Sequence, residues 1–290
     1  MKQKIEDFLV FLINIKGIAK NTEISYRRDL NNMIHFFENS DINSVKNITF
    51  TNINSYILYM EKQGKSPSSV SRNISCMRSF FRYLLNKGEI QTDPTMMVTM
   101  PKVEKKQPEV VSANTMEMLI KAPSAKDAKG IRDKAMIQLL YATGMRVSEL
   151  IRLSLEDLNM DMRYVTLHNS KKVRIVSFDT KTKNILKKYL SESRNILADD
   201  KIENLFVNCN GKEMTRQGFW KIIKGYAKEI GITEDISPHT LRHSFGAHLM
   251  ENGADIKKVS EAMGHSDISY TNIYAKMTED KLREMYNKTH

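Results

Sequence analysis

Hydrophobic residues recur at three- and four-residue steps through the first 88 residues of the chain. This spacing is typical of helices that each bury one face against their neighbours. The pattern therefore predicts a helical bundle that forms a first domain at residues 1–88. Its helices are expected at residues 5–15, 20–38, 51–62 and 66–86.

The pattern changes after residue 88, where prolines and lysines become frequent. Residues 89–110 contain Pro94, Pro101 and Pro108 together with Lys102, Lys105 and Lys106. This composition is typical of an extended basic linker. Because 290 residues are enough for two domains with separate cores, we expect the linker to join two such domains.

From residue 111 to the end the pattern is again mostly helical, with one clear exception. Residues 163–168 and 173–178 alternate between hydrophobic and polar positions and flank the polar segment 169–172. Such alternation is typical of half-buried strands joined by a turn. We therefore predict a mainly α chain whose second domain, residues 111–290, contains a small β-hairpin or sheet and is α+β.

The charge balance is strongly basic. There are 45 Lys and Arg residues against 34 Asp and Glu residues, which gives a net charge of +11 and a pI near 9.4. This balance favours a polyanionic partner. The longest apolar runs are too short to span a bilayer, and no signal peptide is expected. Cys76 and Cys209 fall in different predicted domains, so we expect free thiols in a reducing cytoplasm.

Side chains suited to phosphate chemistry gather near the C-terminus. They are His239, Arg242, His265 and Tyr274, and Arg146 lies upstream in the segment ATGMRVSEL. Guanidinium groups match phosphate oxygens and stay charged at any cellular pH. A tyrosine hydroxyl needs a neighbour such as histidine to take its proton. The set therefore suits attack of a tyrosine on a phosphodiester. Because the bond energy stays in a protein–phosphate ester, neither ATP nor a metal is needed.

The predicted helices would bring these groups together. Ser237, followed by proline, is a typical start for a helix that carries His239, Arg242 and Gly246 on one face. Gly246 has no side chain, so we expect a DNA backbone to approach the helix there. A second short helix would place His265 just past its C-terminal end.

Two further features have more ordinary interpretations. The histidines at 239, 243 and 248 lack cysteine or carboxylate partners at a ligand spacing, so no metal site and no cofactor is expected. Glu149 follows Arg146 by three residues on the same predicted helix. We expect it to orient a neighbouring arginine or histidine rather than to react.

Two segments carry a resemblance to a known family. ATGMRVSELIRL resembles box I of the tyrosine recombinases, or integrase family, and SPHTLRHSFGAHLMENGADIKKVSEAMGHSDISYTNIYAK resembles box II. Matching residue by residue gives the family's catalytic positions as Arg146, His239, Arg242, His265 and Tyr274. No gap is needed between His239 and Tyr274. The resemblance covers nearly the whole chain, whose length is most like that of the bacterial Xer recombinases.

The family's catalytic lysine is the one position where this sequence departs from the pattern. It usually lies in a Gly-Lys-Gly turn of a β-hairpin, followed by Lys-x-Arg. Anchoring the match on Arg174 puts Asn169 at the lysine position, whereas a shift within the turn offers Lys171. We expect Lys171 to be the catalytic lysine, with Lys172 as the alternative. A third interpretation is that both lysines only contact phosphate or solvent.

The resemblance also implies a fold and a mechanism. A helical, SAM-like core-binding domain and a catalytic domain would close as a C-shaped clamp around DNA. Tyr274 would form a 3′-phosphotyrosine and Lys171 would protonate the departing 5′-hydroxyl, with strand exchange through a Holliday junction. On the last helix of the first domain, Arg72, Arg78 and Arg82 are expected to contact phosphates.

The implied partner is double-stranded DNA with paired half-sites. Four protomers would act on it, as a homotetramer or with a sister recombinase, and a DNA translocase is a candidate activator. The amphipathic segment 277–287 would be an exchange helix that docks on the neighbouring protomer, or else a helix packed on its own domain. The expected role is resolution of chromosome or plasmid dimers. The alternatives are a mobile-element integrase or excisionase, a type IB topoisomerase and a non-catalytic DNA-binding module.

Overall fold

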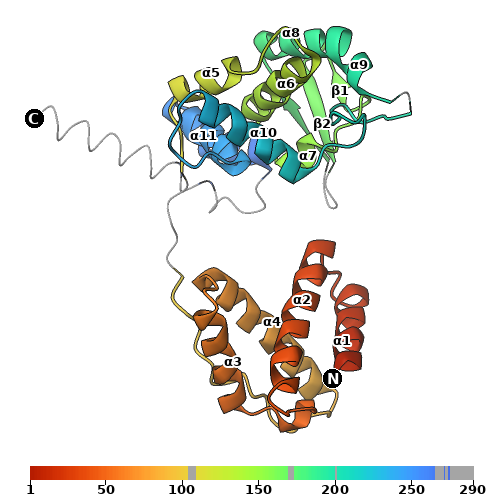
Figure 1. Cartoon of the computed structure of the whole chain (residues 1–290), viewed down its shortest axis with the longest axis vertical. Coiled ribbons are helices and arrows are strands. Elements are labelled where there is room, and N and C mark those ends of the chain that lie inside the picture. The colour runs from red at the N-terminus through yellow and green to blue at the C-terminus, as the bar shows by residue number, and fades with distance from the viewer. Residues whose placement is uncertain (104–108, 169–172, 200, 265–270, 272–273, 275–290) are drawn as a thin grey trace, which may run out of the picture. The chain divides into compact units, whose positions relative to one another are not determined.

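The computed structural model forms two units, Met1–Lys106 and Gln107–His290, whose helices Figure 1 shows. Each unit has its own hydrophobic core. The residues that the structure describes are 1–103, 109–168, 173–199, 201–264, 271 and 274. Within these ranges the fold is mainly α with one small antiparallel sheet, as predicted. None of the described helices is both long and apolar enough to cross a lipid bilayer.

The N-terminal unit is a helical bundle whose helices match the predicted ranges within a few residues. They are α1 (Lys2–Asn14), α2 (Lys20–Glu38), α3 (Phe50–Lys62) and α4 (Pro67–Asn86), with the short helix η1 (Val45–Asn47) between α2 and α3. Thr49 forms a capping box at the start of α3, and Ser66 caps α4. Fully buried aromatic rings, among them Phe8, Phe37 and Phe80, fill the core between the helices.

The chain after α4 continues to pack against this bundle. Ile90 and Val98 are buried in the N-terminal core, and the Val98 carbonyl accepts a hydrogen bond from the Arg78 guanidinium. The first part of the segment predicted as an extended linker, 89–110, therefore belongs to the helical unit. Its prolines and lysines suggested exposure, but the two apolar side chains between them are held by burial. Residues 104–108 lie outside the described residues.

Most helices of the C-terminal unit pack around α6 (Ala128–Thr143). The helices of this unit are α5 (Ala113–Lys121), α6, α7 (Val147–Leu150), α8 (Thr180–Tyr189), η2 (Leu190–Arg194), α9 (Asn195–Leu197), α10 (Arg216–Glu229), α11 (Pro238–Glu251) and α12 (Ile256–Met263). Helix α6 is apolar on several faces because it contacts α5, α8 and α11 (Figure 1).

The predicted hairpin is present and carries an additional strand. β2 (Tyr164–His168) pairs antiparallel with β3 (Val173–Ser177), and β1 (Leu158–Asn159) pairs with the other edge of β2. Strand β1 has only two residues, too few to produce an alternating pattern in the sequence. Residues 169–172, the predicted turn with Lys171 and Lys172, lie outside the described residues.

Two left-handed glycines fix the ends of helices that lead into the candidate site. Gly144 follows α6 with φ +58°, and Gly264 follows α12 with φ +62°. A side chain at Gly144 would place its Cβ only 2.1 Å from the Phe245 ring, so both conformation and space require glycine there. Helix α11 begins where predicted, after the N-cap Ser237, and α12 begins after the N-cap Asp255.

Candidate active site

Arg146 is the residue before α7, and its side chain contacts both α7 and the end of α12, which lies far from it in the sequence. Its backbone N–H donates to Glu149 Oε2 at 2.7 Å, and its Nη1 lies 3.3 Å from Glu149 Oε1. Its Nη2 donates to the Gly264 carbonyl at the end of α12 at 2.9 Å. The side chain of Arg146 is partly exposed. The contacts hold Nη1 and Nη2 of the guanidinium and leave part of the side chain accessible to a ligand.

Arg242 lies on α11 and is buried. Its Nη1 donates to the Gly144 carbonyl at 2.5 Å, and its Nη2 donates to the Met263 carbonyl at 2.6 Å. Both carbonyls lie at helix C-termini, where the helix dipole leaves partial negative charge. Burial, and then the charge of Arg146, lower the pKa of Arg242 to about 10, so it remains charged at neutral pH. Arg146 and Arg242 therefore converge on the C-terminal end of α12.

Tyr274 is fully buried beside these cations. Its hydroxyl lies 2.7 Å from His243 Nδ1, in a hydrogen bond that joins residues 31 positions apart. Burial raises the pKa of Tyr274 to about 12, against the opposing effect of the positive charge on Arg242. The ring packs with Val259 and Met263. In this state the phenol is protonated at neutral pH and able to donate to the imidazole.

Gly246 makes room for the Tyr274 ring. A Cβ at Gly246 would lie 2.8 Å from the Tyr274 ring atom Cε2 and 2.9 Å from Met263 Sδ. Real Cβ atoms do not come so close to their neighbours, so any larger residue here would displace the tyrosine or the methionine. The expectation that this glycine admits a DNA backbone was therefore wrong, because the space is already filled from within the protein.

The sequence analysis did not predict the hydrogen bond between His243 and Tyr274, because it considered His243 only as a possible metal ligand. Burial lowers the pKa of His243 to about 4, with further contributions from His239 and Arg242. A neutral imidazole has one ring nitrogen free to accept a hydrogen bond. Gly246, three residues after His243 on the same helix, could have indicated this contact, because a glycine there leaves space for a ring beside the histidine.

The pKa of His243 predicts a pH dependence of stability. The folded-state pKa of about 4 lies below the ordinary value of 6.5, so the unfolded chain binds the proton first as the pH falls. The stability that the neutral His243 contributes is therefore fully present above pH 6.5 and is lost as the pH falls from 6.5 to about 4. This loss in the free energy of unfolding is at most about 3 kcal/mol. Urea unfolding followed by the fluorescence of Trp220, the single tryptophan, measures it.

The matched variant is His243→Asn, which keeps a polar side chain but cannot titrate. Its free energy of unfolding should approach that of the wild type as the pH falls through this window. A constant difference between the two proteins at every pH would contradict the assignment.

His239 lies in the first turn of α11 and is exposed. Desolvation by neighbouring atoms lowers its pKa, and so do the charges of Arg216 and Arg242. The structure thus places His239, Arg242, Arg146 and Tyr274 around one site. The other predicted catalytic residues, Lys171 with its alternative Lys172 and also His265, lie outside the described residues. Among the residues that are described, no group of three or more His, Cys, Asp or Glu could hold a metal ion.

The arginines predicted to contact DNA on α4 differ in their surroundings. Arg72 forms an ion pair with the buried Asp29, and Arg78 donates to the Val98 carbonyl. Arg82 is exposed. Two of the three guanidiniums therefore already have protein partners, and their contact with phosphate remains a prediction.

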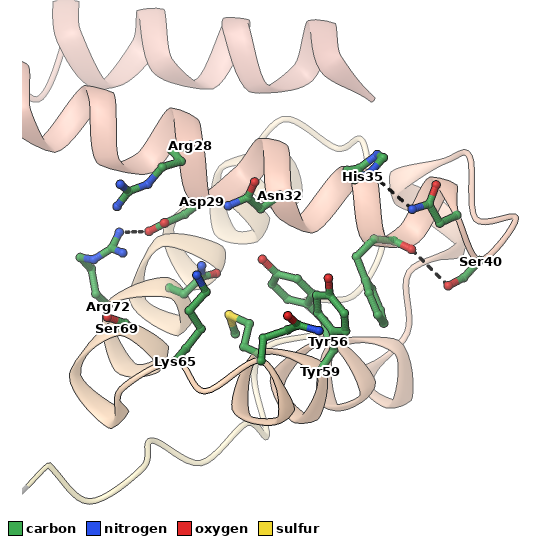
Figure 2. A pocket seen from close by; sticks show the side chains of 15 residues that line it. Arg28, Asp29, Asn32, His35, Ser40, Tyr56, Tyr59, Lys65, Ser69 and Arg72 are labelled. Carbon is green, nitrogen blue, oxygen red and sulfur yellow. Dashed lines mark hydrogen bonds and ion pairs between the residues drawn. The ribbon is translucent and has the colours of Figure 1, made fainter.

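Arg72 borders a cavity of about 630 Å³ in the N-terminal unit. Figure 2 shows Arg28, Asp29 and Arg72 grouped at one end of this cavity, with the rings of Tyr56 and Tyr59 farther along it. Lys65 also lines it. Arg28, Lys65 and Arg72 outnumber the single carboxylate of Asp29, so this end of the cavity is positively charged. The sequence analysis had not identified Arg28 or Lys65 as candidate DNA contacts.

Comparison with known proteins gives a consistent result over both units. The sequence model of the phage integrase family matches residues 109–281, and that of the phage integrase N-terminal SAM-like domain matches residues 5–88. The chain is 41% identical to tyrosine recombinase XerD of Listeria innocua serovar 6a, over 100% of this chain and 99% of the relative. It is also 41% identical to tyrosine recombinase XerD of Oceanobacillus iheyensis, again over 100% and 99%.

Solved structures show the same fold. The XerH site-specific recombinase bound to palindromic difH substrate in a post-cleavage complex superposes with a TM-score of 0.75. That match covers 98% of this chain and 94% of the solved chain, at 19% identity.

Proposed function

The chain belongs to the phage integrase family and is a site-specific tyrosine recombinase, and from that premise we propose that it resolves dimers of chromosomes or plasmids. Identity near 40% over the full chain to relatives named XerD supports this role. The bacterial cytoplasm, where the chromosome lies, is the compartment that we infer.

The observation that carries the mechanism is the convergence of Arg146 and Arg242 on the end of α12, beside Tyr274. We propose that the two guanidiniums bind the non-bridging oxygens of the scissile phosphate. They would stabilise the charge that develops there during attack. Because the phenol is buried, binding of DNA has to expose its hydroxyl before it reacts.

In the cleavage step the Tyr274 oxygen attacks phosphorus, and the bond from phosphorus to the 5′-oxygen breaks. The product is a 3′-phosphotyrosine and a free 5′-hydroxyl. The phenolic proton passes to a neighbouring histidine, His239 or His265, and these two side chains also assist with hydrogen bonds. Lys171, or Lys172 as the alternative, supplies the proton that the departing oxygen needs. The ester conserves the energy of the broken bond, so the reaction as proposed uses neither ATP nor a metal ion.

The 5′-hydroxyl of a partner strand then attacks the phosphotyrosine in reverse, which exchanges strands and produces a Holliday junction. We propose that four protomers, identical or with a sister recombinase, act on two sites with paired half-sites. The segment 277–287 would couple neighbouring protomers, and a DNA translocase would activate the assembly. The positive cavity around Arg72 and the arginines Arg78 and Arg82 would hold the DNA backbone.

The proposed role predicts where covalent complexes form in the genome. Cells producing the protein are lysed in denaturant, the protein–DNA adducts are purified, and the attached DNA is sequenced. We expect one dominant site with inverted half-sites, and the protein joined to a 3′-phosphate through Tyr274. A junction at the ends of a mobile element would identify an integrase instead. Scattered junctions, with relaxation of plasmids that lack a partner site, would identify a topoisomerase.

A further inference from the structure

Strand β3 has an unusual distribution of polar and apolar side chains. Val173 and Ile175 point outward and are 62% and 64% exposed, whereas Arg174 faces inward together with the buried Val176. A cation on the inner face of a sheet loses hydration, so it requires a partner of opposite charge. The sequence thus places a cation where an apolar residue would be expected.

The partner is Glu149 on α7. Arg174 Nη1 donates to Glu149 Oε1 at 2.7 Å, and Nη2 donates to Oε2 at 2.9 Å. This is the bidentate arrangement in which the fork of an arginine matches a carboxylate. Burial alone would raise the pKa of Glu149, but the hydrogen bonds from Arg174 and from the Arg146 backbone outweigh it and lower the pKa. The carboxylate is therefore ionised at neutral pH.

Arg174 also contacts the end of α12. A Cβ at Gly264 would lie 2.7 Å from Arg174 Cζ, so this glycine rests directly against the guanidinium. The Gly264 carbonyl is the one that accepts from Arg146 Nη2. Arg174 thus touches both groups that hold Arg146, namely the carboxylate of Glu149 and the backbone of Gly264.

The distances indicate how the charge of Glu149 is shared. Both contacts from the Arg174 guanidinium, at 2.7 and 2.9 Å, are shorter than the single contact of 3.3 Å from the Arg146 guanidinium. Glu149 orients Arg146 mainly through the backbone N–H, at 2.7 Å. The nearby Arg174 therefore neutralises the carboxylate that would otherwise compete with a phosphate for Arg146.

The Nε of Arg174 supports a role beyond packing. It is buried and makes no hydrogen bond to the part of the chain that the structure describes. Buried donors of a side chain that only stabilises a fold are nearly always satisfied, so an exception calls for a functional explanation.

We propose that Arg174 is a positioning residue for the cleavage step, which takes up most of the negative charge of Glu149 so that the guanidinium of Arg146 remains able to bind the scissile phosphate. The inference rests on the proposed function, because it takes Arg146 as a ligand of that phosphate. This role also explains why an arginine faces inward on β3. The Arg174 guanidinium is required by the neighbouring site rather than by the sheet.

The test compares Arg174→Gln with the double variant Arg174→Gln/Glu149→Gln. The substrate is a nicked DNA that traps the covalent adduct, present at saturating concentration. The single variant should form adduct roughly 10- to 100-fold more slowly, because an unpaired carboxylate then binds Arg146 and shifts it. Affinity for DNA should change by less than about threefold, because the loss falls on the transition state rather than on binding.

The double variant should react faster than the single one. Glutamine at 149 can still accept from the Arg146 backbone N–H, but it has no negative charge with which to compete for the guanidinium. A purely structural role predicts the opposite, since two lost buried groups would add their damage. Arg163→Gln is the matched control, because it removes an exposed arginine that bonds Thr180 at the other end of the hairpin, and its rate should equal that of the wild type.

Arg174→Lys is the second variant if the glutamine variant unfolds, and thermal melting of each protein checks this. Lysine keeps the charge but not the fork, so a rate between those of the wild type and Arg174→Gln is expected. A wild-type rate in the lysine or glutamine variant, or a double variant no faster than the single one, would overturn the inference. Absence of adduct from the wild-type chain would instead overturn the proposed function, and this inference with it.

Discussion

Replacing Tyr274 by phenylalanine should abolish covalent capture of DNA and leave binding to the site nearly unchanged. The substitution removes only the hydroxyl, which is the proposed nucleophile. The ring remains, and with it the packing against Met263 and the close fit over Gly246. The measurement is a trapped adduct on nicked DNA, resolved on a denaturing gel, alongside a binding titration with intact DNA.

The cost in stability of this substitution should be small. The phenylalanine variant loses the hydrogen bond between the hydroxyl and His243, which corresponds to about 1 kcal/mol. Tyr274→Ala is the contrasting variant, because it empties a fully buried ring position and should cost about 3–5 kcal/mol. Any adduct formed by the phenylalanine variant would show that another residue is the nucleophile and would remove the basis of the mechanism.

Most of the fold could be predicted because its signals are local. Amphipathic spacing predicted the four N-terminal helices within a few residues, and the N-cap Ser237 marked the start of α11. The segment after α4 shows the limit of this approach. Its composition suggested an extended linker, but Ile90 and Val98 find apolar partners in the helical core. The composition of a segment does not show which apolar surface of the folded protein lies beside it.

The site could be predicted only as a set of residue types. The motifs named Arg146, Arg242 and Tyr274, which the structure places close together. They did not show that Tyr274 meets His243, because that contact depends on which side of α11 faces the final segment. Spacing along a helix specifies its own face but not the partner that covers it.

The same limit applies to Arg174, which entered the sequence interpretation only as an anchor for matching the family's lysine. Its inward direction follows from the alternation of β3, which could be predicted. Its partner on α7 depends on tertiary packing, which could not.

Replacing Arg242 should reduce cleavage about as strongly as any substitution outside the nucleophile. The residue is 6% exposed, and the two Nη atoms of its guanidinium donate to carbonyls at the ends of α6 and α12. Arg242→Gln removes the charge and cannot reach both carbonyls. Loss of a preorganised donor to the transition state lowers the rate by about 10²- to 10³-fold. Each carbonyl left unpaired should also lower the free energy of unfolding by about 1–3 kcal/mol.

Arg242→Lys separates the two effects. An ammonium group keeps the charge beside the helix ends but cannot bind two acceptors in the geometry of the guanidinium fork. The lysine variant should therefore unfold at higher urea concentration than the glutamine variant while still forming adduct at least about 10²-fold more slowly than the wild type. Adduct formation is measured at saturating DNA below the unfolding transition, so the rate refers to folded protein. A lysine variant that cleaves at the wild-type rate would show that only the charge matters, and that the placement of Arg242 between α6 and α12 serves stability alone.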